Sequence, residues 1–482
     1  MRMNDTIYSA IRLHAESDPE RTAIVEDGRS ITYAGLDRLV DAIAHKISGK
    51  NAGDRIGIVM SHGIEMIAAM MAVLKSGAAY VPAEPSLPSD RIKYMMESAG
   101  VRLVIDNAFV SNLTAPESEI PDRSTPDAMA YILYTSGTSG RPKGVMVDNH
   151  NVVNYARAFN NEFRNGKGDV MLQCSVCSFD IFVEEVFATL INGATLAIPP
   201  VEISAGDVEA LMGFVERHGV TMISGFPYLL AEMNRRKLLP LSLRLLISGG
   251  DVLRASYIDW LKEQGVAVYN TYGPSETTVC ASYYRCDGRT ALPDGTYPIG
   301  KAIAGVTIKI MGPHGNNLPF GTTGEICIFG DGVSRGYVGN PPESSNFFID
   351  PDGNRGYRSG DIGYMLADGN IAFLHRKDTQ VMILGKRVEP DEVENVLNES
   401  PDVERGVVCP FADDNGLAYL VAYFVPKHGK ASLKAIRRWL ASKLTDFMIP
   451  EFFVEMKSIP LTVRGKIDRA SLPVVRKDGD RK

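Results

Sequence analysis

One stretch of this chain indicates its fold and chemistry more clearly than any other: Tyr131-Ile-Leu-Tyr-Thr-Ser-Gly-Thr-Ser-Gly-Arg-Pro-Lys-Gly-Val-Met-Val147. An apolar strand at 130–134 leads into a loop of Thr, Ser and Gly, and a second apolar strand follows at 145–147. Glycines let backbone amides converge on a small anion, hydroxyls add donors, and Lys143 adds a positive charge. The spacing differs from a Walker A loop, because Pro142 precedes the lysine and a glycine follows it. Taken alone, the stretch predicts either a phosphate-binding loop or an exposed Ser/Gly turn.

Strand and helix patterns alternate before this loop. We expect strands at 22–25, 31–33, 55–59 and 78–82. Helices are expected after Thr6, towards Lys46 and at 63–76. This alternation predicts a parallel α/β sheet.

Length and composition limit the class of protein and the number of domains. The chain has 482 residues, of which 45% are hydrophobic and 23% charged, so we expect a globular protein of two or three domains. The net charge of −7 gives no support for a nucleic-acid or membrane partner. The chain shows no signal-peptide run and no 18-residue apolar stretch, and its six cysteines are scattered, so we expect reduced thiols and a cytoplasmic location.

More motifs follow the loop in order. They are Asn270-Thr-Tyr-Gly-Pro-Ser-Glu276, Gly324-Glu-Ile-Cys-Ile-Phe-Gly330 with Ser334-Arg-Gly-Tyr337, Tyr357-Arg-Ser-Gly-Asp361, Arg376-Lys-Asp378-Thr-Gln-Val-Met-Ile-Leu-Gly385-Lys-Arg387 and Arg464-Gly-Lys466. Each motif is weak by itself, but their common register across the whole chain is specific. The set resembles the AMP-forming adenylating enzyme superfamily, which includes acyl-CoA synthetases, luciferase and the adenylation domains of nonribosomal peptide synthetases. It is most similar to a stand-alone amino-acid adenylation domain.

The resemblance implies a fold and a domain division. It implies a large N-terminal α/β core with parallel sheets at 1–375, a hinge at 376–378 that contains Asp378, and a small mobile α+β C-terminal domain at 379–482. His375 departs from the family, where Gly is usual, and we assign it no role.

The resemblance also implies a reaction that uses ATP and Mg²⁺. A carboxylate attacks the α-phosphorus of ATP, which gives an acyl-adenylate and pyrophosphate, and a thiol then takes the acyl group. Lys466, Thr135 and Glu276 match catalytic positions, and Glu276 matches the metal ligand. The positions matching the nucleotide site are Thr135, Ser136, Gly137, Thr138, Lys143, Asn270, Thr271, Tyr272, Gly273, Ser275, Asp361, Phe373, Arg376 and Lys466.

Each match has a simpler alternative when the residue is taken alone. Tyr272 matches the adenine-stacking tyrosine, but a core tyrosine after a buried strand is the alternative. Asp361 matches the ribose ligand, but Ser-Gly-Asp is also typical of an exposed turn. Lys466 matches the lysine that stabilises transition-state charge, but Arg-Gly-Lys is also typical of an exposed basic turn.

The substrate pocket follows from the same resemblance. Asp180 matches the carboxylate that pairs with an α-ammonium group, so the substrate is expected to be an amino acid; a helix N-cap is the alternative. Glu184 is the charged exception in an otherwise apolar or small wall. A buried carboxylate calls for a cation, which predicts lysine or ornithine, with β-lysine open, unless Glu184 faces solvent or a protein Arg. Glu185 matches a structural carboxylate. The predicted wall is Asp180, Ile181, Glu184, Ser224, Ile247, Gly249, Thr271, Val279 and Cys280.

The segment Cys174-Ser-Val-Cys177 has the C-x-x-C spacing of many zinc sites. A zinc site needs two further ligands, and none stands nearby in the sequence. We therefore expect buried apolar cysteines.

Neither a carrier-domain signature nor a condensation motif is recognisable in the chain. We expect a free-standing enzyme, or one cut from a larger synthetase, that works with the substrate amino acid and a carrier protein supplied in trans, and possibly with a small helper protein. No nucleic acid or membrane partner is expected. The alternatives are a D-alanyl carrier-protein ligase, an acyl-CoA ligase, or an inactive nucleotide-binding module.

Overall fold

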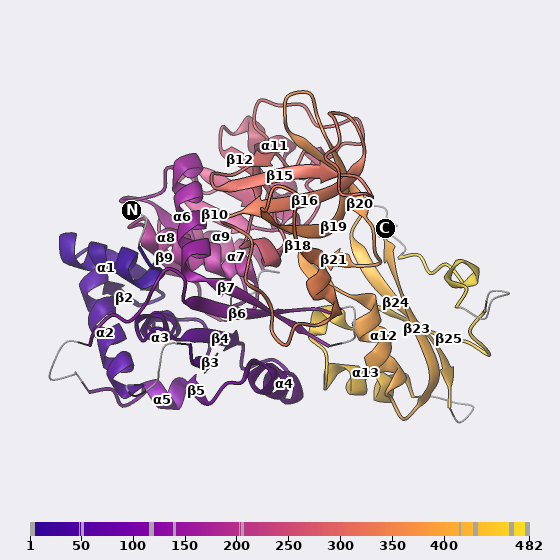
Figure 1. Ribbon diagram of the computed structural model, residues 1–482, viewed down its shortest axis with the longest axis horizontal. Coiled ribbons are helices and arrows are strands. Elements are labelled where there is room, and N and C mark those ends of the chain that lie inside the picture. The colour runs from indigo at the N-terminus through magenta and orange to yellow at the C-terminus, as the bar shows by residue number, and fades with distance from the viewer. Residues whose placement is uncertain are drawn as a thin grey trace. The chain divides into compact units, whose positions relative to one another are not determined.

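The computed structural model describes residues 5–47, 49, 53–114, 120–137, 141–201, 203, 207–413, 416–427, 432–461 and 467–477. The chain, coloured by residue number in Figure 1, forms two compact units. Unit 1 comprises 1–85, 96–134 and 144–377, and unit 2 comprises 86–95, 135–143 and 378–482. The phosphate-loop segment 135–143 thus belongs to unit 2. The part played by Asp378 as a hinge stays a prediction.

A mostly parallel sheet of six strands carries the first motif. Its order is β17-β7-β6-β4-β3-β5, and β3, β4, β5 and β6 run parallel. The strands are β3 (Arg55–Val59), β4 (Ala79–Ala83), β5 (Leu103–Asp106), β6 (Met129–Thr135), β7 (Lys143–Asp148) and β17 (Gly336–Tyr337). The expected strands at 55–59, 78–82, 130–134 and 145–147 are therefore confirmed.

A second sheet has nine strands in the order β14-β13-β12-β11-β10-β8-β9-β1-β2. Its strands from β12 to β1 are parallel, so the carboxyl ends of β10, β11 and β12 meet at one edge, where ligand sites usually lie. The strands are β1 (Thr22–Glu26), β2 (Arg29–Thr32), β8 (Val170–Leu172), β9 (Thr195–Ile198), β10 (Met222–Gly225), β11 (Leu245–Ser248), β12 (Ala267–Tyr272), β13 (Ser282–Arg285) and β14 (Lys301–Ala302).

Helices connect these strands, and side-chain caps fix several starts. Thr6 caps α1 through a reciprocal pair of bonds with Ser9, as its position predicts. Thr32 accepts a hydrogen bond from the Gly35 amide, so Tyr33 begins α2 and does not extend the expected strand 31–33. The helices are α1 (Ile7–Ser17), α2 (Tyr33–Lys46), α3 (Ile64–Lys75), α4 (Ser89–Ala99), α5 (Asn107–Val110), α6 (Asn149–Phe163), α7 (Asp180–Val183), the π-helical turn η1 (Glu184–Ala188), α8 (Thr189–Ile191), α9 (Val208–Arg217), α10 (Pro227–Arg236), α11 (Asp259–Glu263) and the 3₁₀ turns η2 (Ala255–Tyr257), η3 (Ser275–Thr277) and η4 (Pro342–Asn346).

An antiparallel sheet completes unit 1, which the sequence patterns did not predict. Its order is β15-β16-β19-β18, with β20 paired to β19. Its apolar side includes Ile308, Ile326 and Ile371, with Tyr272 and Phe373 packed against them. The strands are β15 (Val306–Met311), β16 (Gly324–Gly330), β18 (Phe347–Ile349), β19 (Arg355–Met365) and β20 (Ile371–Arg376).

The C-terminal part of unit 2 is a small α+β fold, as expected (Figure 1). Val393, Ile436 and Leu440 of its two helices pack with its sheet in one apolar core. The second helix ends at Ala441, and Leu444 is buried just beyond it. The elements are β21 (Val381–Ile383), β22 (Lys386–Val388), α12 (Pro390–Asn398), β23 (Val403–Ala412), β24 (Ala418–Pro426), α13 (Leu433–Ala441), η5 (Asp446–Met448), β25 (Phe452–Glu455) and η6 (Arg469–Ser471).

Among the described residues, no helix combines the length and the apolar character needed to cross a membrane. The six cysteines are free thiols, as expected.

Candidate active site

Asp180 stands at the first position of α7, directly after the N-cap residue Phe179. Asp180 is therefore not the N-cap residue itself. Its carboxylate accepts hydrogen bonds from the Ser275 hydroxyl and from the first amides of the helix. Desolvation outweighs these bonds and raises the pKa of Asp180 to about 6, and the neighbouring charge of Glu276 acts in the same direction.

Glu184 lies where this helix widens into the π-turn η1, a feature often found at functional sites. Its side chain is only 1% exposed, and one carboxylate oxygen accepts a hydrogen bond from the hydroxyl of Tyr155 in α6. The other oxygen is buried and has no hydrogen-bond partner among the described residues. Burial raises the pKa of Glu184 to about 7, although the nearby hydroxyl groups of Ser224 and Tyr155 favour its charged form.

Two alternatives for Glu184 were solvent exposure and pairing with a protein Arg. The burial of Glu184 excludes the first. Among the described residues, no Arg or Lys pairs with its carboxylate, and the charged group that acts on its pKa is another carboxylate, Asp180.

Glu185, the next residue, is hydrogen-bonded to other residues of the protein. Its carboxylate accepts from the Ser175 amide at 3.1 Å, the Ser175 hydroxyl at 2.9 Å, the Cys174 amide at 3.2 Å and the Gln173 side chain at 3.1 Å. These bonds hold the loop after β8 in place. The structure thus gives adjacent carboxylates different surroundings, because only Glu184 keeps a buried oxygen without a partner.

The carboxyl ends of three parallel strands supply further predicted wall residues. Ser224 on β10 is in register with Ile247 on β11, and Thr271 lies near the end of β12; all three are buried. Gly249 follows β11, and a Cβ atom there would lie 2.8 Å from the Thr271 hydroxyl. The close approach to Thr271 therefore requires a glycine here. The place of Gly249 in the substrate wall stays a prediction.

A tight turn at 278–280 places Val279 and Cys280 next to the end of β12. Thr278 and Val279 have φ angles of 61° and 67°, a region that β-branched residues rarely adopt. A Cβ atom on Gly273 would lie 2.5 Å from the Val279 carbonyl, so the turn packs closely on the end of β12. Burial, and then the charge of Glu184, raise the pKa of Cys280 well above its usual value. Cys280 therefore lies beside Glu184.

The interactions described above bring the predicted wall residues together within unit 1. They join Asp180, Glu184, Ser224, Thr271 and Cys280, with Ile181 on the same short helix.

A second group of predicted residues lies where β12 meets the antiparallel sheet. The Tyr272 hydroxyl donates to one oxygen of Asp361 at 2.6 Å, and Arg376 pairs with the other oxygen at 2.6 Å. Asp361 and Arg376 are direct partners in the β19–β20 register. Asp361 is 6% exposed within a strand, which excludes the alternative of an exposed turn. Phe373 packs in the apolar cluster that also contacts Tyr272.

Glu276 lies on η3 and is fully buried. One of its oxygens accepts from the Tyr337 hydroxyl at 2.6 Å. Asn270, by contrast, donates its side-chain amide to the Pro298 carbonyl at 2.9 Å, so this amide contributes to the protein's own packing.

The phosphate-loop residues belong to unit 2. The Thr135 hydroxyl is buried and has no hydrogen-bond partner among the described residues. The Ser136 hydroxyl donates to the Arg387 carbonyl at 3.1 Å, and the Gly137 amide donates to Glu392 at 3.3 Å. Lys143 is buried at the start of β7. Thr138 and Lys466 lie outside the described residues.

Two residues at these sites were not among the sequence-based candidates. Tyr337 stands inside the quoted segment Ser334–Tyr337, so its position was marked although its bond to Glu276 was not. Tyr155 had no local signal, because it is one aromatic residue on the buried face of α6. Only its contact with Glu184 singles it out.

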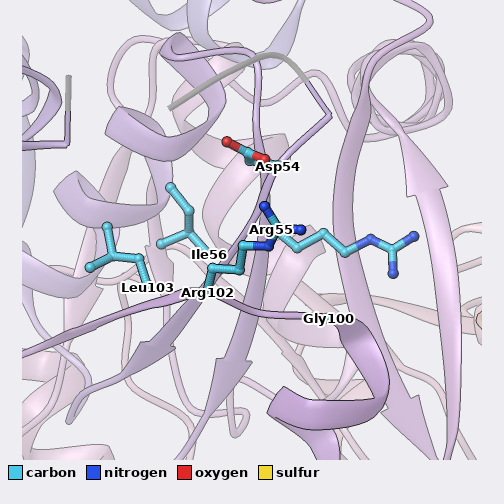
Figure 2. A pocket seen from close by; sticks show the side chains of 6 residues that line it. All are labelled: Asp54, Arg55, Ile56, Gly100, Arg102 and Leu103. Atoms are coloured by element: carbon cyan, nitrogen blue, oxygen red, sulfur yellow. The ribbon is translucent and has the colours of Figure 1, made fainter. Parts of the chain in front are cut away.

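The cavity in Figure 2 lies elsewhere, at the start of β3 and before β5. Its lining is Asp54, Arg55, Ile56, Gly100, Arg102 and Leu103. Its volume of about 20 Å³ suits a water molecule and is far too small for an amino acid or a nucleotide.

Comparison with known proteins shows the family. Residues 11–338 match the model of the AMP-binding enzymes, and residues 392–466 match the AMP-binding enzyme C-terminal domain. Bacitracin synthase 2 of Bacillus licheniformis is 34% identical over 487 residues, which cover 98% of this chain and 19% of that protein. The chain thus spans about a fifth of the length of this relative.

Solved structures share the fold. An artificially fused adenylation–PCP di-domain from Klebsiella oxytoca, NpsA-ThdA, superposes with a TM-score of 0.86 at 24% identity and 94% coverage of both chains. A double mutant of o-succinylbenzoate CoA synthetase from Bacillus subtilis also gives 0.86 at 24% identity, with 97% and 98% coverage. The expected fold class is confirmed. The chain belongs to the AMP-binding enzyme family, the AMP-forming adenylating superfamily that its motifs resemble.

Proposed function

We propose that this protein activates a basic amino acid with ATP, forms the aminoacyl-adenylate with release of pyrophosphate, and passes the aminoacyl group to the phosphopantetheine thiol of a carrier protein. One observation carries the substrate assignment: Glu184 is a buried carboxylate, and the described residues supply one of its oxygens with no partner and the group with no cation. Leaving a buried charge unpaired is costly, so a cation on the substrate is the simplest partner.

Asp180 and Glu184 together favour a substrate with two ammonium groups. The charge of Asp180 raises the pKa of Glu184, so the two carboxylates are close enough to interact. In the proposed complex, Asp180 pairs with the amino group nearest the carboxyl group, and Glu184 pairs with the ω-ammonium group of lysine or ornithine. β-Lysine also has two ammonium groups and belongs to the same substrate class.

In the proposed nucleotide site, different side chains bind the base, the ribose and the phosphates. Tyr272 stacks on adenine, Asp361 accepts the ribose hydroxyls, and Arg376 orients that carboxylate. Thr135, Ser136 and Lys143 bind phosphate oxygens. The buried Thr135 hydroxyl, which finds no partner in the described part of the chain, fits that role. Lys466 stabilises the charge that develops on the reacting oxygens.

Glu276 suits Mg²⁺, because a buried carboxylate offers the hard oxygen ligand this cation prefers. Tyr337 binds one of its oxygens at 2.6 Å and thereby orients the group. When bound, Mg²⁺ would neutralise phosphate charge.

The family relationship supports the carrier-protein partner. Bacitracin synthase 2 is a synthase, and the Klebsiella oxytoca structure joins an adenylation domain to a PCP domain. The fold alone also suits an acyl-CoA ligase, as o-succinylbenzoate CoA synthetase shows. Asp180 argues against that function, because an acyl substrate without an amino group would leave this buried carboxylate without a cation. A helper protein and a cytoplasmic location stay predictions.

Substrate-dependent ATP–pyrophosphate exchange tests the proposal. The panel contains L-lysine, D-lysine, β-lysine, L-ornithine, L-arginine, D-alanine, L-phenylalanine and benzoate. We expect exchange with lysine or ornithine and ~10⁴-fold weaker exchange with uncharged analogues, because these leave Glu184 unpaired. Glu184→Gln should reduce lysine-dependent exchange far more than ATP binding.

The panel also separates the alternatives. Exchange with D-alanine or phenylalanine alone would keep the enzyme class and overturn the role of Glu184. Exchange with benzoate alone would indicate an acyl substrate. If no compound supports exchange even after a helper protein is supplied, the chain is an inactive nucleotide-binding module.

A further inference from the structure

Three side chains from distant parts of unit 1 meet at the ends of its strands. His62 stands in the turn between β3 and α3, Glu84 directly follows β4, and Cys177 lies in the loop between β8 and α7. Their ligand atoms all lie within 4.8 Å of one another. None of these residues takes part in the proposed adenylation chemistry.

The surrounding contacts prepare His62 to bind a cation. The Gln173 side-chain nitrogen donates to the Ser175 carbonyl at 2.6 Å, so the Gln173 oxygen is the atom facing His62 Nδ1 at 3.0 Å. His62 Nδ1 must then carry the proton, which leaves a lone pair on Nε2. That Nε2 atom is buried and has no hydrogen-bond partner among the described residues. An imidazole oriented by a second residue in this way is typical of metal ligands.

The other two groups can supply the negative charge that a bound cation needs: the Glu84 carboxylate, and Cys177 once a metal displaces its thiol proton. Glu84 is 9% exposed, and one of its oxygens accepts from the Ser178 amide at 3.1 Å. Cys177 is 1% exposed and hydrogen-bonds to Glu84. Within the described residues, no ion pair links Glu84 to a Lys or Arg. A divalent cation would balance one carboxylate and one thiolate exactly in charge, with a neutral imidazole as the third ligand.

We propose that His62, Glu84 and Cys177 form a binding site for a borderline divalent transition metal of the Zn²⁺ type, with water as the fourth ligand. Zn²⁺ is bound by this mixture of nitrogen, sulfur and oxygen, at about 2.0–2.3 Å from each ligand atom. Mg²⁺ and Ca²⁺ prefer oxygen alone, so the site is chemically distinct from the proposed Mg²⁺ site at Glu276. On binding, Cys177 loses its thiol proton to solvent and its sulfur bonds to the metal.

The site also has a structural consequence. Cys177 stands three residues before Asp180, and the Ser178 amide is already bonded to Glu84. The ring of His62 lies 5.3 Å from the ring of Phe182, which stands on α7 together with Asp180. A metal ion here therefore ties the turn after β3 to the loop that positions Asp180.

The C-x-x-C spacing is not what forms this site. Cys174 directs its thiol to Glu185 at 3.4 Å and to the Ser224 carbonyl at 3.6 Å. Cys174→Ser is therefore a matched control, because it changes a cysteine of the same loop and leaves all three ligands intact.

The test uses the full chain, free of ATP and Mg²⁺, and two probes, Zn²⁺ alone and Co²⁺ alone. We expect one Zn²⁺ per chain after gel filtration and a rise in Tm of about 2 °C or more with Zn²⁺. Bound Co²⁺ should show the intense near-ultraviolet absorption of a thiolate ligand. Cys177→Ser should lose this absorption, His62→Gln should weaken Zn²⁺ binding ~100-fold or more, and Cys174→Ser should retain both signals.

Two results would overturn the site. One is a wild-type protein with neither a Zn²⁺-dependent rise in Tm nor thiolate absorption with Co²⁺. The other is thiolate absorption that survives Cys177→Ser or disappears in Cys174→Ser. If Cys177→Ser does not fold, as judged by circular dichroism, the comparison between His62→Gln and the wild-type chain decides: equal Zn²⁺ affinity contradicts the proposal.

Discussion

Tyr155 donates its hydroxyl to the Glu184 carboxylate, and both side chains are buried in unit 1. The bond joins α6 to the π-turn η1. It holds one carboxylate oxygen in place, and the other has no partner among the residues that the structure describes. This arrangement offers a single directed acceptor inside a small apolar wall, which suits recognition of one ammonium group at a fixed depth.

Removing the Tyr155 hydroxyl should weaken recognition of a basic substrate. A hydrogen bond to a charged group contributes about 1.5–3 kcal/mol, so Tyr155→Phe should reduce kcat/KM for lysine by roughly 10–100-fold. The KM for ATP should change little, because Tyr155 contacts Glu184 of the proposed amino-acid pocket and no described residue of the proposed nucleotide site. Pyrophosphate exchange with varied lysine and varied ATP measures both. Unchanged lysine kinetics in a folded variant would contradict the proposed role of Glu184.

Activation of a basic substrate should increase with pH. In the free enzyme, burial raises the pKa of Glu184 to about 7 and that of Asp180 to about 6. A cationic substrate binds the ionised carboxylates, so kcat/KM for lysine should rise up to tenfold per pH unit below about pH 7 and level off above it. Glu184→Gln should remove the step near pH 7 and keep the one near pH 6. A profile that falls with rising pH in this window would exclude an ionised Glu184 in the complex.

The same raised pKa gives a stability prediction of defined sign. Between about pH 4.5 and pH 7, the folded chain keeps the Glu184 proton that the unfolded chain has lost. This group therefore makes the free energy of unfolding fall as pH rises through that window. Urea unfolding of the wild type and of Glu184→Gln at both ends of the window should show a smaller fall in the variant. An equal fall would assign the pH dependence to other groups.

Asp361 should govern ATP binding without affecting the choice of amino acid. Asp361→Asn removes the negative charge that pairs with Arg376 at 2.6 Å and weakens the bonds proposed for ribose. The KM for ATP should rise about tenfold or more, with little change in the ranking of the substrate panel. Tyr272→Phe is the milder comparison, because it keeps the ring and removes only the bond to Asp361. A larger effect of Tyr272→Phe than of Asp361→Asn would contradict this assignment.

Glu185 should matter for stability more than for specificity. Both of its oxygens accept bonds from the Ser175 amide, so Glu185→Gln places an amide NH₂ against donors. We expect a loss of about 1–3 kcal/mol in the free energy of unfolding, measured with urea. The substrate ranking should stay as in the wild type, in contrast to Glu184→Gln. A changed ranking with unchanged stability would reverse the roles of these two neighbours.

Local patterns determined much of this protein. Apolar runs with turn residues at their ends located the strands β3, β4, β6 and β7. A strand that is buried on both faces of a sheet is a continuous apolar run, which can be recognised in the sequence. The hydroxyl of Thr6 marked the start of α1 for the same local reason. The motif register also identified the family, and two of the carboxylates it marked, Asp361 and Glu276, are buried and hydrogen-bonded.

The tertiary structure decided which residues that are distant in the chain contact one another. Tyr155 faces Glu184 only because α6 packs beside η1, and the register of β19 and β20 alone places Arg376 opposite Asp361. His62, Glu84 and Cys177 stand in three separate loops, so their spacing carries no metal signature. Composition and periodicity record which face of an element is buried. They do not record which buried group it meets, because that contact is set by how the parallel strands align and return the chain to one edge.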